Sequence, residues 1–218
     1  MSLRHVIFDC DGVLVDSEPI SMRADVALLK QHGVSITERE AHDRFVGKTF
    51  QAMLDDVTAR EGTQFPAGLS AVKDRMVEDM YRSELRIVPG VVDVLNHLKR
   101  KGISMSIASN SPRSRVELAL ELTGITRYFS GITSVADVKQ GKPHPEIFEL
   151  AAARAKVLVT DCMVIEDSMT GVTAAVAAKI RTIGFVGTHH EPDKQAGALK
   201  AIGAFAVVKR MDSLPNYL

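Results

Sequence analysis

Four short groups of polar residues in this chain have the types and the order that phosphoryl and metal chemistry would need. They are Asp9-Cys10-Asp11-Gly12, Ser109-Asn110-Ser111, Gly141-Lys142-Pro143 and Glu166-Asp167. Paired carboxylates repel each other unless a cation or proton lies between them, and an all-oxygen set of ligands suits a hard ion such as Mg²⁺. Hydroxyl, amide and backbone N–H donors at a helix N-terminus can hold phosphate oxygens, and lysine adds a compact positive charge. Each group alone is a weak signal, but together they predict a site for Mg²⁺ and a phosphoryl group.

The four groups fall at the ends of short apolar runs that we expect to be β-strands. These runs, rich in valine and isoleucine, cover residues 5–8, 104–108, 162–165, 181–186 and 204–208. Apolar residues at helical spacing lie between them, over residues 91–98, 116–122, 145–153 and 170–178. Strands that alternate with helices predict a parallel sheet buried on both faces. We therefore expect an α/β fold with a Rossmann-like parallel sheet, helices on both faces, and ligands at the carboxyl ends of the strands.

Residues 17–85 break this alternation and contain no convincing strand. Apolar residues lie on one helical face in three stretches, from Ile20 to Leu28, from Phe50 to Val57 and from Val72 to Met80. Glycines separate these stretches. We expect a helical bundle at 17–85, inserted as a cap into an α/β core made of residues 1–16 and 86–218.

The overall composition is that of an ordinary globular protein. Among 218 residues, 27 basic and 27 acidic side chains give a formal net charge of zero, and 45% of the residues are hydrophobic. This composition excludes disordered classes, and the neutral balance argues against a nucleic-acid binder.

Features of the chain also bear on its location. No apolar run approaches the roughly 20 residues needed to cross a bilayer, and the N-terminus lacks the plan of a signal peptide. Two isolated cysteines, Cys10 and Cys162, favour a reducing compartment. We expect a cytoplasmic protein with no nucleic-acid or membrane partner; its oligomeric state is open, and a monomer is compatible with the sequence.

The order of the four groups resembles the four motifs of the haloacid dehalogenase superfamily, and the resemblance covers essentially the whole chain. The matching segments are Asp9-x-Asp11-Gly12-Val13, Ser109-Asn110, Lys142-Pro143 and Glu166-Asp167. A helical cap after the first motif is similar to that of subfamily I phosphatases and β-phosphoglucomutases. The resemblance therefore implies the same α/β core with an inserted cap.

The resemblance also implies a role for each motif residue. Asp9 would be the nucleophile that forms an aspartyl-phosphate, and Asp11 would protonate the leaving alcohol and later activate water. The phosphoryl oxygens would be bound by Ser109, Asn110 and Lys142. Mg²⁺ would be held by Asp9, Asp167, Glu166 and Asp11, the last through its backbone carbonyl.

Comparison within the superfamily favours a phosphatase. Dehalogenases lack the second acid of the first motif, which is Asp11 here, and no cap lysine lies in a recognisable motif of the phosphonatase branch. β-Phosphoglucomutases carry a hinge histidine, where this chain has Ser21, and a cap-loop arginine, whose position falls near Phe50. The expected substrate is a small phosphorylated metabolite, a sugar or sugar-acid phosphate, because the first motif is similar to that of 6-phosphogluconate-type phosphatases.

Two alternatives come from other functional classes, beside the mutase. Gly47-Lys48-Thr49 suggests a P-loop, but His42 stands where that motif requires glycine. A non-enzymatic phosphate-binding or receiver-like module could use acidic strand ends, yet it would not need the inserted helices.

The candidate substrate-specificity residues are Lys48, Thr49 and Arg113.

Overall fold

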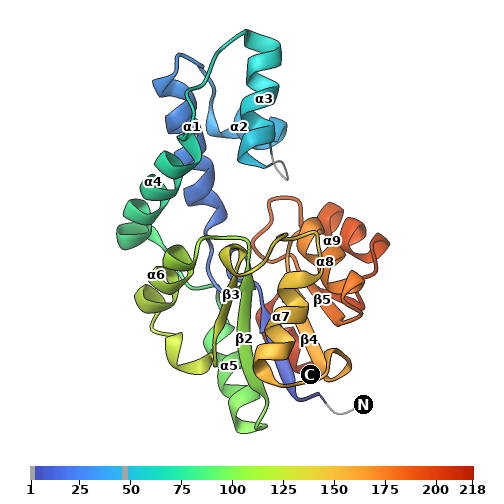
Figure 1. Cartoon of the computed structure of the whole chain (residues 1–218). Helices are drawn as coiled ribbons and strands as arrows, with labels where there is room; N and C mark the ends of the chain where they lie inside the picture. The colour runs from blue at the N-terminus through green and yellow to red at the C-terminus, as the bar shows by residue number, and fades with distance from the viewer. Residues whose placement is uncertain (1–2, 46–48) are drawn as a thin grey trace. The chain divides into compact units, whose positions relative to one another are not determined.

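The computed structural model describes residues 3–45 and 49–218, and the chain divides into two compact units (Figure 1). One unit comprises residues 1–16 and 86–218, and the other comprises residues 17–85. In the described part of the chain, no helix is both long and apolar enough to pass through a membrane.

The first unit is built on a six-stranded sheet whose strand order is β3-β2-β1-β4-β5-β6. All neighbouring strands pair in parallel. The strands are β1 (His5–Phe8), β2 (Ser104–Ser109), β3 (Ile132–Ser134), β4 (Cys162–Glu166), β5 (Arg181–Phe185) and β6 (Ala206–Val208). The α/β fold with a Rossmann-like parallel sheet, predicted from the sequence, is thus confirmed.

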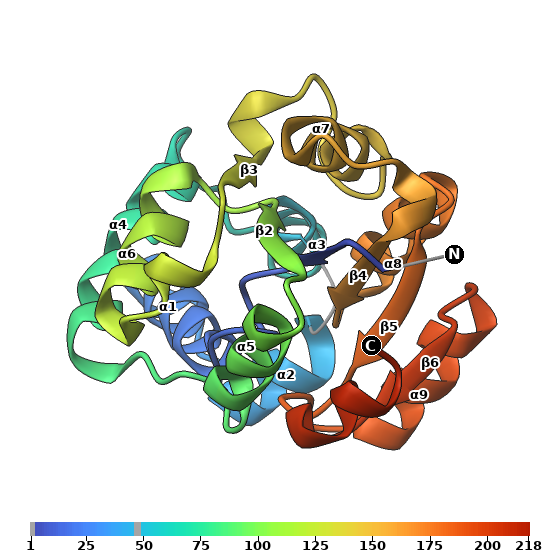
Figure 2. The same ribbon diagram turned by 90° about the horizontal axis from the view of Figure 1, so that it is seen from below.

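Helices cover both faces of this sheet (Figure 2). They are α5 (Val91–Arg100), α6 (Arg113–Thr123), α7 (Glu146–Ala155), α8 (Met169–Ala177) and α9 (Pro192–Ala201), together with short 3₁₀ segments η1 (Thr126–Tyr128), η2 (Val135–Asp137), η3 (Val159–Asp161) and η4 (Met211–Asn216). In Figure 2, α7 and α8 lie on one side of the sheet and α5 on the other. Phe148 of α7 and Ala174 of α8 share one core cluster with Ile7 of β1. Every residue of β1 is buried, because helices pack on both of its faces.

The second unit consists, in its described residues, of helices and their connecting loops: α1 (Glu18–Gln31), α2 (Glu38–Phe45), α3 (Phe50–Glu61) and α4 (Leu69–Glu84) (Figure 1). Its own core joins Leu29, Phe45, Met53, Val57 and Leu69, among others. The helix α2 was not among the three helical stretches expected from the sequence. It is short and strongly charged, and of its eight residues only Ala41 and Phe45 are buried, so it offers little apolar periodicity.

Candidate active site

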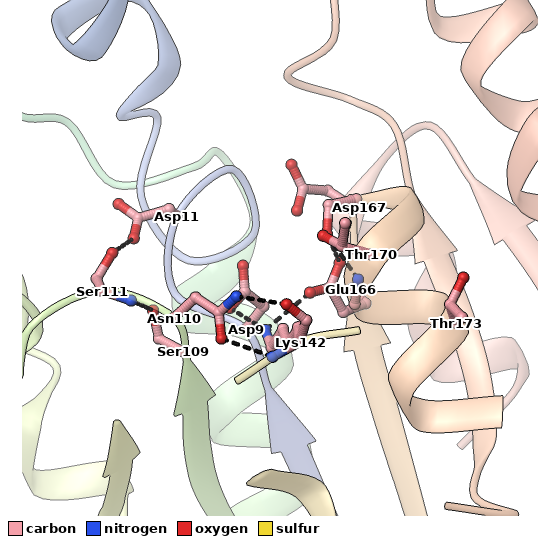
Figure 3. A network of polar contacts seen from close by, with 12 residues as sticks. Asp9, Asp11, Ser109, Asn110, Ser111, Lys142, Glu166, Asp167, Thr170 and Thr173 are labelled. Atoms are coloured by element: carbon pink, nitrogen blue, oxygen red, sulfur yellow. Dashed lines mark hydrogen bonds and ion pairs between the residues drawn. The ribbon is translucent and has the colours of Figure 1, made fainter. Parts of the chain in front are cut away.

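The carboxyl ends of three adjacent strands bring most of the predicted residues together (Figure 3). The parallel register aligns Phe8 of β1 with Ile107 of β2 and with Ile165 of β4. The residues just beyond these positions therefore meet at one edge of the sheet: Asp9 after β1, Ser109 at the end of β2, and Glu166 at the end of β4. In β1 and β4 an apolar run directly precedes the acidic residue, so the strand delivers that carboxylate to this edge.

Lys142 lies at the centre of the group. Its Nζ is 2.6 Å from Asp9 Oδ1 and 2.8 Å from Glu166 Oε1, and its side chain is 3% exposed (Figure 3). Burial lowers the pKa of Lys142, but the attraction of Asp9 and Glu166 raises it by more. The pKa is therefore raised overall, and the ammonium stays charged. Lys142 Nζ also lies 5.1 Å from the centroid of the Phe148 ring, so an aromatic side chain of α7 packs against the ammonium.

Lys142 does not follow a strand directly, which is a correction to its expected position at a strand end. It lies in the loop between η2 and α7, and the side chain of Asn110 holds that loop. The Lys142 N–H donates to Asn110 Oδ1 (2.9 Å), and Asn110 Nδ2 donates to the Lys142 carbonyl (3.0 Å). A Cβ at Gly141 would come within 2.6 Å of Asn110 Oδ1, so this close contact requires glycine. Asn110 was expected to bind phosphate, but both polar ends of its side chain contact Lys142; its backbone amide remains the candidate donor.

Three buried carboxylates form a group that could hold a metal ion. One oxygen each of Asp9, Glu166 and Asp167 lies within 4.8 Å of the others. Burial raises the pKa of Asp9 well above its usual value, since Lys142 only partly offsets burial and the repulsion from Glu166 and Asp167. Burial also raises the pKa of Asp167 to about 6. A cation would relieve this accumulation of negative charge, and the all-oxygen ligands fit Mg²⁺.

Local backbone geometry aims these carboxylates. The Ser168 N–H donates to Glu166 Oε2 at 2.6 Å, and the Ser168 hydroxyl then caps α8 through the Gly171 N–H. Gly12 has φ +76°, and a Cβ there would come 2.2 Å from Asp167 Oδ2. Glycine at position 12 thus permits both the left-handed turn after β1 and the approach of Asp167.

The loop after β5 contributes a residue that sequence reasoning did not select. His189 Nε2 lies 3.2 Å from Asp167 Oδ2, and Thr188 Oγ1 donates to the Gly12 carbonyl at 2.8 Å. His189 and its neighbour His190 have no further residues at zinc-ligand spacing, so the sequence gives little reason to select His189. The available signal was its position a few residues after an expected strand, at the carboxyl edge of the sheet.

The side chain of Asp11 points away from the three carboxylates and toward the turn after β2 (Figure 3). Its Oδ2 accepts a hydrogen bond from Ser111 Oγ at 2.5 Å. Its side chain is therefore separate from the carboxylate group, and the predicted metal ligand at this residue remains the backbone carbonyl. The buried Ser109 Oγ accepts from the Ser111 N–H at 3.0 Å, a contact that does not use the hydroxyl proton of Ser109.

The three candidate specificity residues were Lys48, Thr49 and Arg113. Lys48 lies outside the described residues. Thr49 belongs to the helical unit, where its Oγ1 accepts from the Ala52 N–H at 3.1 Å and caps α3. Arg113 Nη2 donates to the Ile132 carbonyl and to Asp137 Oδ2, both at 2.9 Å, so its guanidinium ties α6 to β3 and η2.

Comparison with known proteins points to one family. The family model that matches, over residues 6–185, describes a haloacid dehalogenase-like hydrolase. A phosphorylated carbohydrates phosphatase of Thermotoga maritima is 34% identical over 210 residues, which cover 95% of this chain and 94% of that protein. A 6-phosphogluconate phosphatase of Escherichia coli is 28% identical over 86% of this chain and 85% of its own length. A solved haloacid dehalogenase-like protein of unknown function from Agrobacterium tumefaciens has a TM-score of 0.86 at 33% identity, covering 99% of this chain and 97% of that one.

Proposed function

Because the chain belongs to the haloacid dehalogenase-like hydrolase family, it is a phosphoric monoester hydrolase, and we propose that it works through a phosphoryl group carried on Asp9. The motif resemblance found in the sequence is thereby confirmed. The substrates named for the relatives are phosphorylated carbohydrates and 6-phosphogluconate. We infer a sugar or sugar-acid phosphate as the substrate of this chain.

The observation that carries the proposal is the contact of Lys142 with Asp9 inside a buried group of carboxylates. A carboxylate that attacks a phosphate dianion meets charge repulsion, and Lys142 lies where it offsets that repulsion. The hydrogen bond of 2.6 Å from Lys142 Nζ to Asp9 Oδ1 fixes the carboxylate in place for in-line attack. The Ser109 hydroxyl and the backbone amides of the same turn are the proposed donors to the phosphoryl oxygens.

The proposed reaction has two displacements. In the first, an Asp9 oxygen forms a bond to phosphorus while the ester P–O bond breaks, and Asp11 gives its proton to the leaving alcohol. In the second, Asp11 takes a proton from water, whose oxygen attacks phosphorus and releases inorganic phosphate and the Asp9 carboxylate. Splitting the hydrolysis in this way is covalent catalysis.

We propose Mg²⁺ as the cofactor, held by Asp9, Glu166 and Asp167 together with the backbone carbonyl of Asp11. Bound Mg²⁺ would neutralise charge on the transferring phosphoryl group. We assign residues 1–16 and 86–218 as the catalytic core and residues 17–85 as a cap. Both cysteines are buried free thiols, which is compatible with the proposed cytosolic location.

The decisive experiment measures phosphate release from a panel of phosphorylated sugars, sugar acids and sugar alcohols, with Mg²⁺ and with a chelator. We expect Asp9→Asn to lose activity by at least about 10³-fold, because an amide cannot serve as the nucleophile. Asp161→Asn is the matched control, since Asp161 lies at the opposite end of β4. Full activity of Asp9→Asn, or equal activity without the metal, would contradict the mechanism.

The mutase alternative is tested in the same preparation. β-Glucose 1-phosphate is supplied with a bisphosphate activator, and both glucose 6-phosphate and inorganic phosphate are measured. We expect phosphate release to dominate. Formation of glucose 6-phosphate faster than hydrolysis would replace the phosphatase by a mutase.

A further inference from the structure

A chain of hydrogen bonds connects Arg115 to Asp11 through one hydroxyl. Arg115 Nη2 donates to Ser111 Oγ at 2.6 Å, and Ser111 Oγ lies 2.5 Å from Asp11 Oδ2. Ser111 is buried, and Arg115 and Asp11 are partly buried. All three residues belong to the unit that contains the sheet. The contacts are therefore screened from water far more than an ion pair on the surface.

The direction of these bonds follows from the chemistry of the groups. A guanidinium can only donate, so Ser111 Oγ must accept from Arg115. A hydroxyl has a single proton, and Ser111 is therefore left to donate that proton to Asp11 Oδ2. Arg115 thus fixes the orientation of the hydroxyl, and the hydroxyl fixes one oxygen of the carboxylate.

Local structure indicates that the Ser111 hydroxyl is not needed to start α6. The N-cap of that helix is Pro112, and it has no side-chain capping bond. Arg115 follows Ser111 by four residues, the spacing that places side chains on one side of a helical turn. The Ser111 N–H meanwhile donates to Ser109 Oγ at 3.0 Å. One residue thus contacts both the proposed phosphate-binding hydroxyl and the proposed acid.

We propose that Ser111 and Arg115 are positioning residues that hold Asp11 for proton transfer to the leaving alcohol. This inference rests on the proposed function, in which Asp11 is the proton donor. Ser111 holds the carboxyl group in place by donating to Oδ2. Arg115 acts through Ser111 by keeping its hydroxyl proton directed at Asp11.

The effect of misplacing Asp11 should depend on the leaving group of the substrate. An alkyl phosphate leaves as a basic alkoxide and needs a proton in the transition state, whereas a nitrophenyl phosphate leaves as a stable phenolate and does not. The value of kcat/KM reports the steps up to the first irreversible transfer, here the transfer to Asp9. The second displacement is common to both substrates and affects kcat. Misplacing Asp11 should therefore lower kcat/KM for alkyl phosphates selectively.

The test compares kcat/KM for an alkyl sugar phosphate and for 4-nitrophenyl phosphate in Ser111→Ala, Ser111→Thr, Arg115→Met and Arg115→Lys. We expect Ser111→Ala to lose about 10- to 100-fold on the sugar phosphate, a part of the 10²–10⁴ that general acid catalysis supplies, and less than about threefold on the aryl phosphate. Arg115→Met should show the same selectivity with a smaller loss. Ser111→Thr and Arg115→Lys keep a hydroxyl and a donor, so each should recover much of the loss.

Ser114→Ala is the matched control, because Ser114 is an exposed serine in the first turn of the same helix. Thermal unfolding by circular dichroism shows whether each variant is folded. An equal loss on both substrates in a folded Ser111→Ala protein would overturn the positioning role. That outcome differs from failure of the proposed function, in which wild-type activity would not depend on Asp9.

Discussion

Lys142 is buried between Asp9 and Glu166, and its charge allows two carboxylates to lie close together away from water. Asp167 adds a third carboxyl group, so this cluster holds three acidic side chains and one lysine. Removing one member of such a buried group leaves the others without compensation, and the cost is larger than the net value of the original pair. A substitution at one of these residues should therefore lower the free energy of unfolding as well as the activity.

Replacing the lysine should reveal both effects. We expect Lys142→Met to lower kcat by about 10²- to 10³-fold, as for removal of one preorganised donor. It should also lower the free energy of unfolding by roughly 3 kcal/mol, because Asp9 and Glu166 lose their cation. Added Mg²⁺ should recover part of the stability without recovering activity.

Steady-state kinetics and urea unfolding, with and without Mg²⁺, measure these changes. Lys139→Met is the matched control, since Lys139 is an exposed lysine in the same loop. A Lys142→Met protein with normal kcat would show that the charge does not serve catalysis.

The sequence predicts where Asp9 and Glu166 lie in the fold, for a physical reason. Asp9 and Glu166 end short apolar runs, and such runs form strands that deliver their next polar residue to one edge of a parallel sheet. His189 gives no such signal, because a lone histidine in a loop has many ordinary explanations. The side-chain role of Asn110 could not be predicted either, since it depends on a loop 32 residues away.

At the scale of elements, the ones that were missed are those with little periodicity. The strand β3 has three residues, two of which are Thr133 and Ser134, so it forms no apolar run. The helix α9 buries Leu199 as its single fully covered side chain. Both are stabilised by pairing and packing on the sheet, which local sequence does not record. Arg113 of α6 donates to the carbonyl of Ile132, the first residue of β3, and so links these two elements.

In the helical unit, the start of α3 offers a direct test of an element. Thr49 Oγ1 accepts from the Ala52 N–H, and Gly62 ends the helix in a left-handed conformation at φ 72°. We expect Thr49→Ala to destabilise this unit by about 1 kcal/mol, the usual cost of a lost N-cap, and Thr49→Ser to keep most of the stability. Hydrogen exchange of the α3 amides measures the change. Equal protection in all three proteins would show that the cap contributes nothing.

At the scale of the whole molecule, a net charge of zero conceals a separation of the titrating groups. The carboxylate group lies at the carboxyl edge of the sheet, while His5 begins β1 at the other edge. His5 is fully buried, with Nδ1 2.7 Å from Ser104 Oγ and Nε2 2.7 Å from Ser106 Oγ. Its neighbours are neutral hydroxyls, so nothing among these contacts compensates a charge on the imidazole. Its titration should therefore affect folding and not the chemistry of the site.

Burial lowers the pKa of His5 from 6.5 to about 4, which sets the sign of a pH effect on stability. Between these two values the unfolded chain binds a proton that the folded chain does not, so the free energy of unfolding falls as the pH drops through this range. The full loss is about 3 kcal/mol, from 1.36 kcal/mol for each pKa unit.

Urea unfolding at a series of pH values measures this slope. In His5→Asn, which cannot titrate, stability should change less between pH 6.5 and pH 4 than in the wild type. The exposed His144→Asn should keep the wild-type slope. Parallel curves for the wild type and His5→Asn would show that the proton uptake that destabilises the fold occurs at another residue.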